Sequence, residues 1–364
     1  MRRVRVARLI RPMHVPITAR SSAQDGASRA YLDHVRRDAA FHGFIAAYAI
    51  VGLLIGFAAG VPHKFAPFTY AGMVLMALPQ PLALVLAGIG VWSLRSRAPL
   101  QAFRANLAKL LMSPHTVAGL LLFANILIFM GVFTSVKTML PDVNPFFADR
   151  YLADLDGLLH GQDPWVYAVA LLPARLTPVL EVMYFGIWGL LLSVPILAVL
   201  LMPGLRAVRS QYIWTALIIW PLLGNVIAGG VMSAGPVFYD RIVGDARFDG
   251  LVAYVVQHSR VQEWAHAYLW KFYVSGEAGA GVAISAFPSM HVANAMLIVL
   301  LANRIHRWVL GAAVAYCAVI LFGSVYLGWH YAVDGYFSIA ATVMIWKAVG
   351  WALKSKPVMP AARL

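Results

Sequence analysis

The chain has 364 residues, of which 61% are hydrophobic and 12% are charged, and its 29 Lys and Arg outnumber its 15 Asp and Glu. Soluble globular proteins have about 45–50% apolar and about 25% charged residues, so this composition excludes an ordinary soluble enzyme, a disordered chain and a disulfide scaffold. The net charge of +14 does not indicate nucleic-acid binding, because the basic residues interrupt apolar runs instead of forming a patch on a polar domain. The composition predicts an integral membrane protein that has no nucleic-acid partner.

Eight apolar stretches have about the length of a membrane span. A helix needs about 20 apolar residues to cross a hydrocarbon core about 30 Å thick. The stretches are residues 40–61, 68–92, 116–136, 179–202, 211–233, 288–303, 308–329 and 332–352. The second is the least regular, because Pro79, Gln80 and Pro81 interrupt it. Residues 164–176 form a shorter apolar piece, for which we expect an interfacial position. The predicted fold class is all-α, an integral membrane helical bundle of about eight transmembrane helices.

The basic residues predict the orientation of this bundle. With both termini in the cytoplasm, the inner segments contain 21 of the 29 Lys and Arg and the outer segments contain eight. Lys and Arg are concentrated in cytoplasmic loops, so this distribution supports that orientation. Two outer segments, from Lys137 to about Arg175 and from about Ser233 to Phe287, are too long for simple turns. We therefore expect the chemistry at the outer face, which is the periplasmic face if the membrane is a bacterial inner membrane. A eukaryotic internal membrane is the alternative location.

A short polar motif precedes the sixth predicted span. It reads Ser285-Ala-Phe-Pro-Ser-Met-His291, and Pro288 followed by Ser289 predicts a helix with Ser289 as N-cap and His291 in its first turn. The free N–H groups and the positive dipole end of such a helix start favour a phosphate, and a nearby histidine can protonate a leaving oxygen. Taken alone, the motif is also typical of an interfacial cap whose histidine faces lipid headgroups.

A second motif, Gly323-Ser-Val-Tyr-Leu-Gly-Trp-His330-Tyr-Ala-Val-Asp334, lies between the last two predicted spans. His330 and Asp334 are four residues apart, so they share one face if this segment is helical. A carboxylate can hold one imidazole nitrogen and leave the other free and basic, as in hydrolytic triads. A structural hydrogen bond at a helix start is the other interpretation of this pair.

The spacing of the two histidines predicts that they meet. His291 and His330 are separated by 39 residues, which corresponds to about 58 Å of helix. This length is close to one crossing inward and one crossing back. The basic turn Asn303-Arg-Ile-His-Arg307 lies between them, as an inner turn should. A nucleophile, a carboxylate that orients it and a proton donor are therefore expected at one outer surface.

Two other kinds of site use the same residue types. Two histidines and an aspartate could bind zinc, but no further His, Cys or Glu lies nearby at ligand spacing. A transporter could use them as a proton relay, but such relays place ionisable residues at the middle of the membrane, whereas these lie at one interface.

These motifs resemble the type 2 phosphatidic acid phosphatase superfamily, whose motifs read K-x6-R-P, P-S-G-H and S-R-x5-H-x3-D. The inositolphosphorylceramide synthase-like branch, which comprises inositolphosphotransferases, is more similar. That branch has Phe-Pro-Ser-x-His and Tyr-Leu-x-x-His-Tyr-x-x-Asp, matched here by Phe287-Pro-Ser-Met-His291 and Tyr326-Leu-Gly-Trp-His-Tyr-Ala-Val-Asp334. An altered first motif is recognisable as Lys137-Thr-Met-Leu-Pro-Asp-Val-Asn144-Pro145. Three further segments resemble the branch, namely Asn144-Pro-Phe-Phe-Ala-Asp149, Leu155-Asp-Gly-Leu-Leu-His160 and Ser233-Ala-Gly-Pro-Val-Phe-Tyr-Asp-Arg241. The resemblance covers about residues 116–352.

The resemblance implies a role for each matching residue. His330 would attack phosphorus and form a phosphohistidine, Asp334 would orient it, and His291 would protonate the departing oxygen and then activate the acceptor. Lys137 and the region of Ser289 would bind the phosphate oxygens. This covalent route requires no metal ion and no cofactor.

The chain departs from the phosphatase pattern where that pattern has two arginines, because Asn144 and Ser324 stand there. Neither replacement supplies the charge and the bidentate geometry of a guanidinium. Arg241 is the best candidate substitute, since Gly235 and Pro236 are expected to turn the chain back towards the site. Arg150 and Lys271 are weaker candidates. A phosphodiester carries one negative charge fewer than a phosphomonoester, so the missing arginines favour a diester donor.

The predicted function is transfer of a phospho-headgroup between lipid-linked substrates through phosphohistidine at the outer membrane face. Hydrolysis of a lipid phosphate or diphosphate at the same site is the alternative, and transport of a lipid or headgroup is a third. The predicted organisation is a basic cytoplasmic arm (1–38), two additional spans (39–115), a six-helix phosphatase/phosphotransferase core (116–352) and a cytoplasmic tail (353–364).

Overall fold

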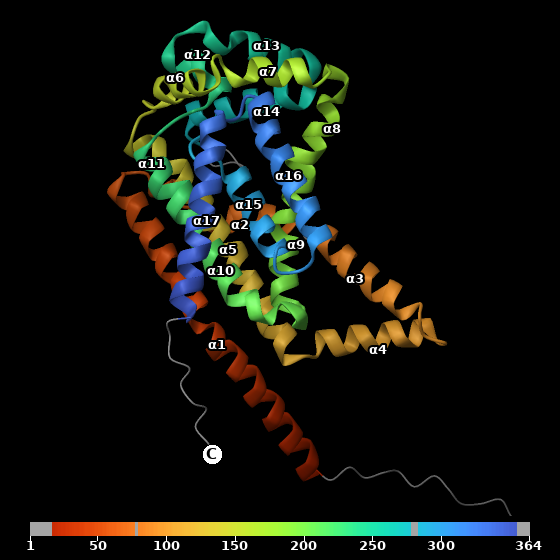
Figure 1. Cartoon of the computed structure of the whole chain (residues 1–364). Helices are drawn as coiled ribbons and strands as arrows, with labels where there is room; N and C mark the ends of the chain where they lie inside the picture. Colours follow the sequence, from red (N-terminus) through yellow and green to blue (C-terminus); the bar gives the residue numbers. More distant parts are fainter. Residues whose placement is uncertain (1–16, 77–78, 278–282, 355–364) are drawn as a thin grey trace, which may run out of the picture.

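The computed structural model describes residues 17–76, 79–277 and 283–354, and its regular elements are all helical within these ranges (Figure 1). Parts of two predicted segments, the basic arm (1–38) and the cytoplasmic tail (353–364), fall outside the described residues. The prediction of an all-α bundle is confirmed. The first helices are α1 (Ile17–Ala58), α2 (Pro67–Met76), α3 (Pro79–Ser93), α4 (Pro99–Leu111) and α5 (Pro114–Val143).

The remaining helices form the bundle and a cap of short helices at one of its ends. The bundle contains α8 (Thr177–Glu181), α9 (Trp188–Leu201), α10 (Arg206–Pro221), α11 (Ala228–Gly230), α15 (Met290–Ala302), α16 (Arg307–Tyr326) and α17 (Ala332–Lys354). The cap contains α6 (Asp149–His160), α7 (Pro164–Leu171), α12 (Tyr239–Val243), α13 (Asp249–His258) and α14 (Arg260–Ser275), which lie together at the top of Figure 1. The two outer segments that were predicted to be too long for turns therefore build the cap.

Six helical segments in the described part of the chain are long and apolar enough to span a membrane. They are Val35–Ala58, Pro114–Val143, Ala174–Leu201, Arg206–Gly230, Arg307–Tyr326 and Ala332–Lys354. Their length and composition confirm an integral membrane protein.

Two of the eight expected spans differ in the structure. The stretch 68–92 is divided into α2 and α3, and Pro79 is the first residue of α3. Proline lacks a backbone N–H and disfavours helical conformation in the preceding residue, which explains the division. The stretch 288–303 contains only the 13-residue α15, about 20 Å long. Residues 164–176 contain the eight-residue α7, too short to span, within the cap.

Helix α15 lies inside the bundle, packed against protein on both faces. Val292 and Ala295 belong to one buried hydrophobic cluster, whereas Ala293 and Leu297 belong to a second. The first cluster surrounds α16 and the cap, and the second surrounds α5 and α10. Protein therefore contacts α15 on both sides, and its first turn, which contains His291, begins beneath the cap.

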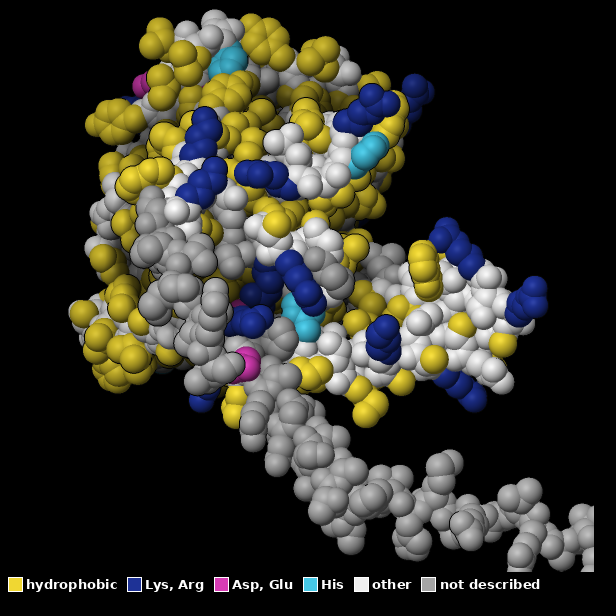
Figure 2. Space-filling view, turned by 60° about the horizontal axis from the view of Figure 1, so that its bottom comes forward, with side chains coloured by type: hydrophobic (Ala, Val, Ile, Leu, Met, Phe, Trp, Pro, Cys, Tyr) yellow, Lys and Arg dark blue, Asp and Glu magenta, His cyan; other side chains and the backbone are white. Residues whose placement is uncertain are grey.

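The end of the molecule opposite the cap is basic. Figure 2 shows Lys and Arg side chains spread over this face with few acidic side chains among them. Arg209, at the start of α10, donates two hydrogen bonds of 2.6 and 2.7 Å to the buried carboxylate of Asp38 and so joins α1 to the bundle. The positive-inside rule predicts that this end is cytoplasmic.

Candidate active site

His330 lies in the turn between α16 and α17 and contacts Asp334, which is in the first turn of α17. Its Nδ1 is 3.3 Å from Oδ2 of Asp334. The segment before Ala332 is not helical, so the expected shared helix face is absent, yet the turn still brings the two side chains together. The backbone N–H of His330 donates to the carbonyl of Ser324, which holds the turn against the end of α16. Asp334 can therefore orient the imidazole through Nδ1, leaving Nε2 for chemistry.

Burial lowers the pKa of His330 to about 3, and the positive charge of Lys137 acts in the same direction. A hydrogen bond with the backbone of Ala286 opposes this change. The imidazole of His330 is therefore neutral at neutral pH, which is the form in which a histidine acts as a nucleophile.

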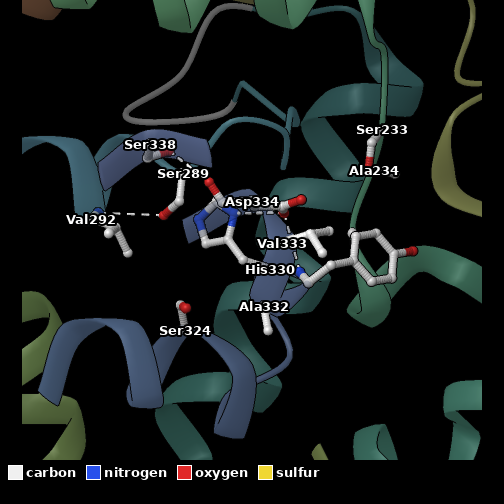
Figure 3. A network of polar contacts seen from close by, with 12 residues as sticks. Ser233, Ala234, Ser289, Val292, Ser324, His330, Ala332, Val333, Asp334 and Ser338 are labelled. Atoms are coloured by element: carbon white, nitrogen blue, oxygen red, sulfur yellow. Dashed lines mark hydrogen bonds and ion pairs between the residues drawn. The ribbon is translucent and has the colours of Figure 1, made fainter. Parts of the chain in front are cut away.

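Hydrogen bonds join the start of α15 to the start of α17 around Asp334 (Figure 3). Oδ2 of Asp334 accepts from the N–H of Tyr331 at 3.1 Å, and its backbone carbonyl accepts from Ser338 Oγ at 2.7 Å. The N–H of Ser289 donates to the same carbonyl at 3.4 Å. Ser289 also caps α15 as predicted, because its Oγ accepts from the N–H of Val292.

Asp156 of α6 holds the start of α17 from the cap side. Its carboxylate accepts from the N–H groups of Ala332 and Val333 at 2.6 and 2.9 Å, which are orphan donors at the N-terminus of α17. Burial raises the pKa of Asp156, and these two hydrogen bonds oppose the rise. Asp156 therefore fixes the backbone immediately after His330.

Asp149 makes a second connection from α6. Its carboxylate accepts from Ser233 Oγ, from the N–H groups of Ala234 and Gly235, and from the hydroxyl of Tyr331, at 2.8–3.0 Å. Burial raises the pKa of Asp149, and the four hydrogen bonds oppose the rise. One carboxylate thus links the loop after α11 to the residue that follows His330.

His291 lies between aromatic rings and faces His330. Its ring centroid is 4.4 Å from that of Tyr184 and 4.1 Å from that of Trp188, and both pairs are stacked. Tyr184 lies in a π-helical turn, Val182–Ile187, a distortion that often occurs at functional sites. The ring centroids of His291 and His330 are 6.1 Å apart. Reacting atoms approach to about 3–3.5 Å before a bond forms, so one phosphorus atom can fit between the two rings.

Both histidines line a cavity of about 540 Å³ whose walls are mainly apolar. Its aromatic wall residues are Phe133, Tyr184, Phe185, Trp188, Trp220, Phe238, Trp264, Tyr268 and Trp329. Among the described residues, Lys137 is the one Lys or Arg in the wall, and no Asp or Glu lines it. Its Nζ lies 5.9 Å from the ring centroid of Phe133. The cavity therefore suits an apolar molecule that carries a single negative charge.

The other predicted phosphate ligands lie outside the cavity wall. Asn144 ends α5, and its side-chain amide donates to the carbonyl of Gly229 at 2.9 Å. Ser289 is fully buried and its hydroxyl is used by the N-cap. Arg241 is exposed and stacks on Trp270 with 4.9 Å between its Cζ and the ring centroid. Helix α12 carries Arg241 to the cap surface beside α14, and Arg241 is not among the described residues that line the cavity with His330.

The hydrogen bonds made by Asp149 and Asp156 of α6 were not predicted from the sequence, although the spacing of these residues indicates them. Asp149 and Asp156 are seven residues apart, and Leu152 and Ala153 between them are buried on the same helix face. Two carboxylates on the apolar face of an amphipathic helix indicate buried hydrogen bonds. No spacing pattern connects Tyr184 to His291, because the π-helical turn sets that contact.

Position 235 requires glycine because of its backbone conformation and its close neighbours. Its φ is +91°, and an added Cβ would lie 2.7 Å from the carbonyl oxygen of Trp329, next to His330. We expect Gly235→Ala to displace Trp329 and lower turnover at least roughly tenfold, because sub-ångström placement of reacting groups controls rate. Gly161→Ala is the matched control, since Gly161 also has a positive φ of +81° but nothing lies within 4 Å of its Cβ position. Both variants should lose some stability, and equal turnover in the two would contradict this role for Gly235.

In the described part of the chain, no group of three or more His, Cys, Asp or Glu is arranged to hold a metal ion.

Comparison with protein families agrees with this geometry. The model of the PAP2 superfamily matches residues 150–350, more than half of the chain, and the match includes both histidines and Asp334. No curated protein sequence and no solved structure matches the chain. The family match covers the same helices that bring His291, His330 and Asp334 together, and the chain therefore belongs to the PAP2 superfamily.

Proposed function

We propose that the protein is a membrane phosphotransferase that moves a phospho-headgroup from a donor phospholipid to a hydroxyl acceptor. Membership of the PAP2 superfamily supports a phosphatase or phosphotransferase of the membrane. The observation that carries the proposal is the pair of histidine rings 6.1 Å apart in an apolar cavity. The Phe-Pro-Ser-x-His and Tyr-Leu-x-x-His-Tyr-x-x-Asp patterns support the inositolphosphotransferase-like branch.

The reaction has two steps. Nε2 of His330 attacks phosphorus, the bond from phosphorus to the departing oxygen breaks, and His291 donates a proton to that oxygen. In the second step, neutral His291 accepts the proton of the acceptor hydroxyl, the acceptor oxygen attacks phosphorus, and the phosphorus–nitrogen bond breaks. Asp334 orients His330 and stabilises its positive charge in both steps.

The single lysine in the wall favours transfer from a diester. One ammonium group balances the one negative charge of a phosphodiester, whereas a phosphomonoester carries about 1.5 to 2 negative charges near neutrality. Hydrolysis with water as the acceptor is the alternative at the same site. The apolar wall, which includes Trp264 of α14, supports a lipid-linked substrate.

The deciding experiment uses purified protein in detergent micelles with phospholipids labelled in the headgroup phosphate, in excess EDTA. We expect the label to move to a hydroxyl acceptor such as inositol or a second lipid alcohol, at a rate that depends on the acceptor. Release of free phosphate or free headgroup phosphate alone would establish the hydrolase instead. Complete loss of activity in EDTA would restore the metal-site alternative.

We also propose that the cap faces the periplasm of a bacterial inner membrane. The basic face opposite the cap supports this orientation (Figure 2). Single cysteines can test it in a Cys317→Ser background. An impermeant maleimide added to intact cells with a permeabilised outer membrane should label Leu158→Cys in the cap and not Met112→Cys after α4. Both native side chains are about 80% exposed, and the reverse labelling pattern would overturn the orientation.

A further inference from the structure

Four residues of the cavity wall carry a polar side-chain atom that has no hydrogen-bond partner among the described residues. These groups are the hydroxyls of Tyr184 and Ser285 and the indole N–H groups of Trp188 and Trp329, and all four atoms are buried. The Tyr184 side chain is completely buried. Buried polar groups are almost always hydrogen-bonded, so a cluster of unpaired ones on a single cavity indicates a ligand that supplies the missing acceptors.

The four residues are close to the two histidines and line the same cavity. Tyr184 and Trp188 stack on the ring of His291. Trp329 directly precedes His330 in the chain, and Ser285 directly precedes Ala286, whose backbone is hydrogen-bonded to His330. All four residues therefore belong to the part of the cavity wall around the two histidines, between which the proposed reaction takes place.

Each of the four groups is neutral and can donate a hydrogen bond. An indole N–H is a donor only, and a hydroxyl can donate one proton. The non-bridging oxygens of a phosphate are acceptors and gain negative charge in the transition state, where such preorganised donors are most effective. The phosphatase pattern supplies two arginines, whereas this chain has Asn144 and Ser324 at those motif positions, and neither residue is among those that line the cavity.

We propose that Tyr184, Trp188, Ser285 and Trp329 bind the non-bridging oxygens of the substrate phosphate and select a monoanionic phosphodiester over a dianionic phosphomonoester. This inference rests on the proposed function, because it concerns the same cavity. Lys137 balances one negative charge and the neutral donors add no positive charge, so the second charge of a monoester would be buried without a counter-ion. Leaving a buried charge uncompensated is strongly unfavourable.

Tyr184→Phe tests the proposal because it removes only the hydroxyl group and keeps the ring that stacks on His291. The control is Tyr212→Phe, because Tyr212 is equally buried but lies in the cluster around α10, outside the cavity wall. Binding is measured in the His330→Ala background, so that the ligand stays intact. The probes are dioctanoyl phosphatidylglycerol, a diester, and dioctanoyl phosphatidic acid, a monoester, each titrated into protein in detergent micelles by calorimetry.

We expect the diester to bind at least tenfold more tightly than the monoester, and Tyr184→Phe to weaken diester binding about tenfold while Tyr212→Phe changes it less than twofold. Tighter binding of the monoester, or unchanged diester binding in Tyr184→Phe, would overturn the inference. Turnover by the His330→Ala variant is a separate measurement. If that variant were fully active, the proposed function would fail, whatever the two binding titrations show.

Discussion

Replacement of His330 by alanine is expected to reduce turnover roughly 10⁴-fold or more, because the proposed nucleophile is removed. Asp334→Asn should reduce turnover by about 10²–10⁴-fold, since the amide cannot stabilise the charged imidazole. Initial rates with a labelled phospholipid measure both effects. His258→Gln in α13 is the control, because His258 lies in the cap, where its ring contacts the carbonyl of Tyr254.

The same assay separates the roles of the two histidines. His291→Gln should lose about 10²–10⁴-fold on a natural lipid, whose alkoxide leaving group needs a proton. The His291→Gln variant should lose much less of the rate at which a p-nitrophenyl phosphodiester forms the proposed phosphohistidine, because nitrophenolate departs without being protonated. His330→Ala should be inactive on both substrates. Acid-labile label retained on His330→Ala protein, or more than about 1% of wild-type turnover, would show that the nucleophile is another residue.

Asp149→Ala is expected to be the most destabilising single substitution in the cap. Four donors lose their acceptor at once, among them the hydroxyl of Tyr331 and two backbone N–H groups. Each buried donor left unsatisfied costs about 1–3 kcal/mol, and proteins are stable by only about 5–15 kcal/mol. The expected loss of stability therefore approaches the whole free energy of unfolding. The turn that contains His330 is affected directly, because the hydroxyl of Tyr331 donates to this carboxylate.

Thermal unfolding in detergent micelles measures this effect, and Asp154→Ala provides the control. Asp154 lies on the same helix, its side chain is 63% exposed, and it pairs with Arg247 at 2.6 Å. Exposed ion pairs contribute about 0–1 kcal/mol, so this variant should unfold close to the wild-type temperature. Equal midpoints for the two variants would mean that Asp149 does not support the loop. Asp149→Asn should fall between them, because its amide keeps one acceptor oxygen.

Much of the bundle could be predicted because membrane insertion depends on local composition. Apolar stretches and the distribution of Lys and Arg are visible along the chain, so six of the eight expected spans follow directly from them. The meeting of His291 and His330 could also be predicted. Two helices joined by a short basic turn bring their far ends back to the same surface. The number of residues between the two histidines is therefore enough to predict that they meet.

Other features depend on neighbours that are distant in the sequence. The turn at Gly235 predicts Arg241 at the phosphate, but the direction of that turn is set by the hydrogen bonds that Ala234 and Gly235 donate to Asp149 and by the approach of Trp329. Tyr184 and Trp188 look like ordinary residues of an apolar span. Only the packing of the π-helical turn against α15 shows that they contact His291.

The 13-residue length of α15 has a consequence for how the chain is assembled in the membrane. A helix about 20 Å long cannot cross a hydrocarbon core of about 30 Å by itself, and its first turns contain His291 and Asn294. Its final depth depends on protein contacts with α10, α16 and α17. We therefore expect α15 to settle only after these helices are inserted. The two histidines then come together last, so a partly synthesised chain lacks the assembled candidate site.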